Sequence, residues 1–204
     1  MALPARPGRA ELDPLLAEHD PRRLVVVGED ADLAAVVLRL LRTERLHVEV
    51  AYLPRRRASA AAAAWGLRTG TAAAAHALSA AAGPVPLIRD DGGGVLVGRG
   101  EIRGVRGECY CDETLVLRGA APWLVVTPGP DGVAVRAGRR GGRPDGRTRP
   151  VPPRAPAGHG SALGRAVQVG CEPATVVLDG VAHPRPIRRW AWYRHTTDWQ
   201  LVRS

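Results

Sequence analysis

The sequence predicts a small α/β unit followed by an all-β unit. Residues 22–42 combine a β-branched run with a segment whose apolar residues recur at helical spacing. A second apolar run and two alanine-rich segments follow up to residue 83, and short β-type runs separated by Gly, Asp and Pro begin at residue 84. Alternating strands and helices favour a parallel pair, whereas strands in close succession favour an antiparallel sandwich.

The α/β part contains two predicted strands and three predicted helical segments. The strands are 24–28, which ends at a glycine, and 47–54, which ends at a proline. The helices are 32–44, 58–65 and 71–82. The first helix has the amphipathic spacing expected of a helix that covers a sheet, with apolar residues Leu33, Val36, Val37, Leu40 and Leu41. We therefore expect a β-α-β-α-α order with parallel strands.

The chain divides into three predicted parts. Residues 1–20 form a loosely ordered leader with a short helix, residues 21–83 the α/β domain, and residues 84–204 the β-sandwich domain. The segment at about 138–160 consists largely of Gly, Pro and Arg, a composition that cannot bury a core, so we expect it to be disordered.

Composition favours a globular protein and restricts its partners. The 204 residues are 45% hydrophobic, and the N-terminus lacks the apolar core of a signal peptide, so the sequence predicts a cytoplasmic protein without a membrane span. Every basic residue is Arg, as expected of a GC-rich coding sequence. Seven arginines and one aspartate fall within 136–154 and supply +6 of the formal charge of +9. This stretch is either a nucleic-acid-binding arm or a solvated linker.

The three cysteines and the aromatic tail each allow a structural and a functional interpretation. Cys109 and Cys111 alternate along one strand, and Cys171 leaves an odd count, which favours buried or half-buried thiols over a metal pair. Trp190 and Trp192 share one strand face. We expect them in the sandwich core, although arginines beside aromatic rings also suit a nucleic-acid stacking surface.

The turn after the first strand raises a question of charge. Gly28 is followed by Glu29, Asp30 and Asp32, and three carboxylates should repel a phosphate from the helix N-terminus. Asp30 lies at the carboxyl end of a strand, where it could hold a metal with help from Asp32. The alternative is that Asp30 or Asp32 caps the following helix.

The turn resembles the first motif of the diacylglycerol kinase and NAD kinase superfamily, a strand followed by Gly-Gly-Asp-Gly-Thr-Leu. Gly28, Asp30 and Leu33 keep their places, whereas Glu29 and Ala31 replace glycines. The resemblance implies a truncated Rossmann-like βα unit followed by an antiparallel β-sandwich, and a use of ATP and Mg²⁺ if the site is active.

The superfamily's second motif, Pro-x-Gly-Thr-Gly-Asn-Asp, is matched in part. Pro54, Ala62 and Gly66 fall in register. Other residues occupy the Gly-Thr-Gly-Asn positions, namely Arg56, Arg57, Ala58 and Ser59. A third motif, Asp-Gly-Glu on a returning strand, keeps two of its residues and is read here as Asp179, Gly180 and Val181.

These losses predict a binding or regulatory module without catalytic or metal-binding residues, because side chains now stand where phosphate needs clearance. The vestigial nucleotide-binding residues are Gly28, Glu29, Asp30, Pro54, Arg56 and Arg57, with Asp179 as the acidic residue of the returning strand. Two alternatives stay open: a divergent ATP-dependent phosphotransferase, and a site where arginines bind an anion directly. The expected partner is an unidentified small molecule or protein, and the sequence is compatible with a homodimer. No bound cofactor is expected.

Overall fold

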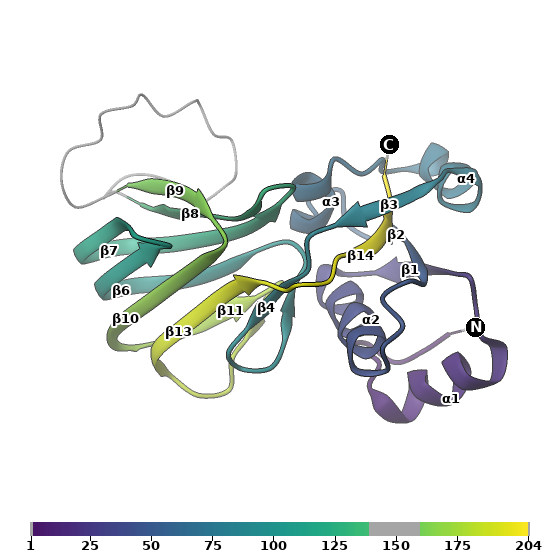
Figure 1. Cartoon of the computed structure of the whole chain (residues 1–204), viewed down its shortest axis with the longest axis horizontal. Coiled ribbons are helices and arrows are strands. Elements are labelled where there is room, and N and C mark those ends of the chain that lie inside the picture. The colour runs from purple at the N-terminus through teal and green to yellow at the C-terminus, as the bar shows by residue number, and fades with distance from the viewer. Residues whose placement is uncertain (1, 139–159, 204) are drawn as a thin grey trace.

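The computed structural model in Figure 1 describes residues 2–138 and 160–203, and these form two sheets with helices gathered on the smaller one. The helices are α1 (Arg9–His19), α2 (Asp30–Arg42), α3 (Ala60–Trp65) and α4 (Thr71–Ser79). Sheet A contains β1 (Arg23–Gly28), β2 (Glu49–Pro54), β3 (Ala82–Val85) and β14 (Trp199–Val202). Sheet B and its short side pair contain β4 (Ile88–Asp90), β5 (Val95–Leu96), β6 (Gly100–Cys111), β7 (Thr114–Gly129), β8 (Gly132–Ala137), β9 (Ser161–Gly164), β10 (Ala166–Ala174), β11 (Val176–Leu178), β12 (Val181–Ala182) and β13 (Ile187–Arg194).

Sheet A has the strand order β1-β2-β14-β3. The first three strands are parallel, which confirms the predicted parallel pair, and β3 runs antiparallel to β14. The last strand of the chain thus lies inside the sheet that the first strand begins. Helices α1 and α2 cover one face, where Leu16, Val26 and Val37 share a core, and α4 covers part of the other face through Ala77.

The N-terminal segment, expected to be loosely ordered around a short helix, contains the eleven-residue helix α1. Leu12 and Leu16 of this helix are buried against the α/β core. Asp13 also forms an ion pair with Arg39 of α2, at 2.6 Å between Oδ2 and a guanidinium nitrogen. Both apolar burial and charge therefore hold α1 on α2.

Sheet B is antiparallel throughout its main path, β5-β4-β13-β10-β6-β7-β8-β9, and β11 pairs with β6 beside it. It encloses a single large core, as predicted for the sandwich. Trp190 and Trp192 lie in this core, at 5% and 0% exposure, which confirms their structural interpretation. Cys109 and Cys111 are buried there too, and burial raises the pKa of the Cys109 thiol to about 12.

The predicted disordered segment and the arginine-rich stretch fall mostly within 139–159, which lies outside the described residues. Among the helices that are described, none combines the length and apolar character needed to cross a bilayer.

Candidate functional site

The candidate site lies where β1 and β2 end side by side. The parallel register pairs Gly28 with Pro54, and the N–H of Arg55 donates to the carbonyl oxygen of Gly28 at 2.9 Å. Glu29 and Asp30 follow directly, at the start of α2. The structure thus brings together four of the residues singled out from the sequence. They lie at the carboxyl ends of the parallel strands, where ligands bind in open α/β folds.

The carboxylate of Asp30 points toward α3. Its Oδ1 accepts hydrogen bonds from the hydroxyls of Tyr52 at 2.9 Å and Ser59 at 2.5 Å. Its Oδ2 accepts from the backbone N–H groups of Ala60 at 2.8 Å and Ala61 at 3.2 Å. Because the first N–H groups of a helix have no acceptor within the helix, Asp30 supplies one from a different element.

Ser59 and Tyr52 hold this carboxylate in place. Ser59 is the N-cap residue of α3, and its Oγ accepts a hydrogen bond from the N–H of Ala62 at 2.9 Å while its hydroxyl donates to Asp30. The Tyr52 hydroxyl also lies 3.1 Å from the carbonyl oxygen of Gly28. Burial, and then the negative charge of Asp30, raise the pKa of Tyr52, so its hydroxyl stays protonated as a donor.

The side chain of Asp32 stabilises the acidic turn after β1. Its carboxylate accepts hydrogen bonds from the N–H groups of Glu29 at 2.8 Å and Arg6 at 2.7 Å. A side chain at Gly28 would meet Asp32, because a Cβ built there lies 2.5 Å from its Oδ2. In these contacts Asp32 caps the following helix α2, as one alternative expected. Asp30 instead accepts hydrogen bonds from the first turn of α3.

Asp179 is buried at the turn between β11 and β12, with a positive φ of 48°. It accepts three backbone hydrogen bonds, from Val97 at 3.0 Å and from Gly98 and Arg99 at 2.8 Å each. Burial raises the pKa of Asp179 to about 7, and the charge of Asp30 adds to the rise, although the three N–H groups lower it. The two carboxylates therefore act on each other across the boundary between the sheets.

Residues 97–99 join the two parts of the molecule. A Cβ built on Gly98 lies 2.5 Å from the backbone nitrogen of Ala61, so this loop packs directly against the first turn of α3. The indole N–H of Trp65, at the other end of α3, donates to the carbonyl oxygen of Val97 at 2.8 Å. Asp179 fixes the loop from the sandwich side, and α3 fixes it from the α/β side.

The arginines that follow β2 lie on the surface. Arg56 pairs with Glu29, at 3.3 Å between Nε and Oε1, and both side chains are exposed. Arg55 and Arg57 are exposed too. Since exposed pairs are screened by water, the contact between Arg56 and Glu29 contributes little to stability.

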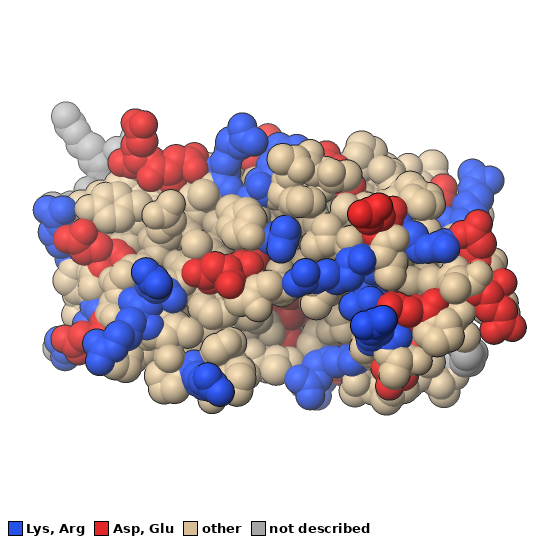
Figure 2. Space-filling model, turned by 60° about the horizontal axis from the view of Figure 1, so that its bottom comes forward, with Lys and Arg blue, Asp and Glu red and all other residues tan. Residues whose placement is uncertain are grey.

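On the face shown in Figure 2, acidic and basic side chains are interspersed, and neither sign gathers into one large patch. Within residues 2–138 and 160–203, no group of three or more His, Cys, Asp and Glu side chains is arranged to hold a metal ion.

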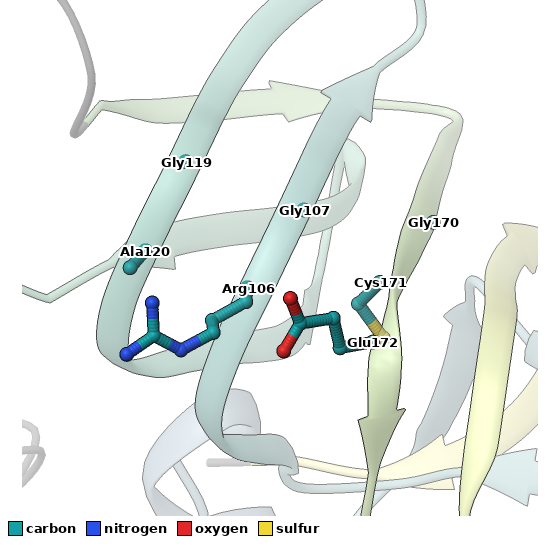
Figure 3. Close-up of a pocket in the computed structure, with 7 residues that line it drawn as sticks. All are labelled: Arg106, Gly107, Gly119, Ala120, Gly170, Cys171 and Glu172. Carbon is teal, nitrogen blue, oxygen red and sulfur yellow. The ribbon is translucent and has the colours of Figure 1, made fainter.

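A hollow lies on the sandwich, and the described residues that line it belong to β6, β7 and β10 (Figure 3). It has a volume of about 490 Å³ and is wide open. Its floor is shaped by glycines on neighbouring strands, including Gly107 and Gly119, which are paired across the hairpin. Among the described residues that line it, Arg106 and Glu172 are the charged ones.

Sequence reasoning missed three contributors to the site: Tyr52, Ser59 and Gly98. Ser59 precedes an alanine-rich helix, the usual place of an N-cap, so this signal was available. The contact of Gly98 with α3 has no local signal, because it depends on how the two sheets meet.

Comparison with known proteins now gives the fold. No family profile matches the sequence, and no curated protein matches it either. A crystal structure of a diacylglycerol kinase from Bacillus anthracis superposes with a TM-score of 0.69 at 12% identity, covering 90% of this chain and 76% of that one. The chain has the fold of the diacylglycerol kinases and NAD kinases.

An NAD kinase from Archaeoglobus fulgidus, solved in complex with ATP, shows the same kinase-like fold. It gives a TM-score of 0.53 at 11% identity, and the match covers 89% of this chain and 78% of that one. A putative diacylglycerol kinase from Bacillus anthracis gives 0.66 at 11% identity, with 90% and 78% covered. The resemblance inferred from the motifs is thus confirmed for the fold: an α/β part followed by an antiparallel sandwich.

Proposed function

We propose that the protein is a non-catalytic binding or regulatory module built on the kinase-like fold. The observation that carries this is the position of the Asp30 carboxylate, which accepts hydrogen bonds from the N–H groups of Ala60 and Ala61. Kinases bind phosphate through such backbone donors. Here the donors already have an anionic partner within the chain.

Electrostatics and space both support this proposal. A phosphate approaching α3 would meet the carboxylate of Asp30, with Glu29 and Asp32 in the same turn of chain. The charge of Asp30 also acts on Asp179. Gly98 contacts the first turn of α3 and leaves no clearance for a Cβ there. An incoming anion would therefore have to displace a hydrogen-bonded carboxylate and separate two packed backbones.

Isothermal titration with ATP and Mg²⁺ tests the proposal. We expect no micromolar binding by the wild type, and none by a variant carrying Glu29→Gly, Ala31→Gly, Arg56→Gly and Ala58→Gly, because Asp30 remains in place in both. A parallel assay offers diacylglycerol and NAD as phosphate acceptors. Turnover of either would show a working phosphotransferase. Micromolar ATP binding would show a functional nucleotide site, as in the NAD kinase solved in complex with ATP.

Titration with inorganic phosphate tests the alternative in which arginines bind an anion directly. If Arg55, Arg56 and Arg57 bind an anion through their guanidinium groups, inorganic phosphate should bind the wild type and bind the Arg56→Gly variant more weakly. We expect no phosphate binding, since Arg56 already faces Glu29 at 3.3 Å.

A second candidate function rests on the arginine-rich stretch 136–154, which carries seven arginines and one aspartate. Such a segment would bind DNA or RNA weakly and independently of sequence, with an affinity that falls steeply as salt rises. Deleting residues 138–158 removes six of the seven arginines. A loss of both affinity and salt dependence would support the arm, whereas unchanged binding would identify a linker.

A further inference from the structure

Strand β1 is an outer strand of sheet A. The strand order places β2 on one side of it, and within the described residues no strand lies on the other side (Figure 1). An outer strand presents unpaired N–H and C=O groups and is a natural template for another strand.

The backbone shows which residues face this open edge. The carbonyl oxygens of Arg22 and Gly28 accept hydrogen bonds from the N–H groups of Glu49 and Arg55, so the even-numbered residues of β1 point toward β2. Polar backbone groups of successive residues in a strand point to opposite sides. Val25 and Val27 therefore direct their N–H and C=O groups outward.

The same two residues also expose their side chains. Leu24 and Val26 pack toward α2, so Val25 and Val27 lie on the opposite face, where they are 38% and 63% exposed. Near the start of β1, Arg23 donates to the carbonyl oxygen of Leu78 of α4 at 2.8 Å.

The side chain of Leu78 is 71% exposed. Val25, Val27 and Leu78 therefore form an exposed apolar surface beside an open strand edge. Natural edge strands usually protect such a surface with charge.

We propose that β1 pairs with β1 of a second copy of this chain, antiparallel, about a twofold axis through Val26. A twofold axis perpendicular to a sheet keeps equivalent side chains on the same face, so each Val25 lies opposite Val27 of the second copy. The outward N–H and C=O groups of these residues then pair with each other. Two four-stranded sheets become one continuous sheet.

Charge at the strand ends favours this occupant and this register. Arg22 and Arg23 precede the valines, and the acidic turn that begins with Glu29 follows them. In the antiparallel pair, the basic end of each strand meets the acidic turn of the other copy. The side chain of Arg22 is 91% exposed and that of Glu29 46%, so both are accessible for the contact. An axis through Val25 would instead set Arg23 against Val27.

This inference does not depend on the proposed function, since it uses the open edge of sheet A and not the hydrogen bonds of Asp30. Sedimentation of the full chain from low to high micromolar concentration tests it. We expect a concentration-dependent dimer for the wild type and a roughly tenfold or larger rise in the dimer dissociation constant for Val27→Lys. The matched control is Leu163→Lys, on the outer strand β9 of the other sheet, where Leu163 is 56% exposed.

Charge exchange provides an independent test of the register. Arg22→Glu alone and Glu29→Arg alone should each weaken the dimer, because like charges then meet at both ends. An equimolar mixture of the two variants should dimerise again. In the mixed pair the two introduced side chains, which are opposite in charge, meet at one end, and the native contact is retained at the other. Thermal melts of each variant confirm that it is folded.

Three results would overturn the proposal: a wild type that stays monomeric at every concentration, dissociation by Leu163→Lys but not by Val27→Lys, or a mixture of charge-exchanged chains that dimerises no better than either alone. Binding of a strand from a different protein to an otherwise monomeric chain would reject the second copy as the occupant.

Discussion

At the scale of single residues, Asp30 has the largest predicted effect on stability. Replacement by alanine leaves the Ser59 hydroxyl and two N–H groups of α3 without their acceptor. We expect Asp30→Ala to lower the free energy of unfolding by about 1.5–3 kcal/mol, the range for hydrogen bonds to a charged group. Urea denaturation measures the change.

The control for that substitution is Glu18→Ala, at an exposed position of α1. Surface changes of this kind usually stay within about 0.5 kcal/mol. If Asp30→Ala were as mild as the control, water or another anion would be able to replace the carboxylate, and the argument that Asp30 closes the site would fail.

Asp179 gives the fold a pH dependence of definite sign. Its pKa is raised to about 7 by burial, whereas an unfolded chain has an aspartate pKa of about 3.9. Between these values the folded state binds the extra proton, so this residue stabilises the fold at low pH. The contribution declines as pH rises from about 4 through about 7 and is constant above that range.

Comparison with Asp179→Asn isolates this contribution, because all other titrating groups, including His195, are common to both chains. We expect the free energy of unfolding of the wild type to fall with pH, relative to that of the variant, across the interval from about 4 to 7. A difference that does not change with pH would mean that the carboxylate is already ionised at the low end, held by its three N–H donors.

At the scale of elements, Gly98 tests the packing of the sandwich loop on α3. A Cβ built there lies 2.5 Å from the nitrogen of Ala61. Because backbone cannot yield as a flexible side chain does, we expect Gly98→Ala to destabilise the protein by about 1–3 kcal/mol. Gly170→Ala is the matched control, since a Cβ at that strand position meets nothing within 4 Å. Thermal denaturation that affects both variants equally would contradict the contact.

The sequence predicted the elements whose own residues carry a clear hydrophobic pattern. The β-branched run ending at Gly28 and the apolar run ending at Pro54 predicted neighbouring parallel strands, and the register pairs Gly28 with Pro54. The position of β14 could not be predicted in this way. Its four residues, Trp199–Val202, fit either sheet by composition, and only long-range pairing with β2 and β3 places them in sheet A.

The candidate site was predictable to the same extent. Residues on the two strand ends were found because the carboxyl ends of parallel strands coincide. The partners of their side chains were not found, since the bond from Ser59 to Asp30 depends on the path of the loop after β2. The hydrogen bonds that the N–H groups of residues 97–99 donate to Asp179 span 80 to 82 positions in sequence. They depend on how the two sheets meet.

At the scale of the whole molecule, the chain crosses between the two sheets twice. The chain passes from sheet A to sheet B after β3 and comes back to sheet A only with β14, between β2 and β3. Ending the chain after β3 would therefore leave sheet A without an inner strand. The contacts of Gly98 with Ala61 and of Trp65 with Val97 add a direct bond between the parts.

This arrangement predicts a single cooperative unfolding transition rather than one for each sheet. Trp65 and Trp199 lie in the core of sheet A and Trp190 and Trp192 in the core of sheet B, so tryptophan fluorescence reports on both. We expect the fluorescence and circular-dichroism melts to coincide, and the calorimetric enthalpy to equal the van't Hoff enthalpy. Gly98→Ala should lower the single midpoint, because the contact between the parts contributes to the stability of each. The contrary result would be two separated transitions, with Trp190→Leu shifting one and Trp65→Leu shifting the other. It would show that the sheets unfold independently and that the contacts of residues 97–99 with α3 do not couple them.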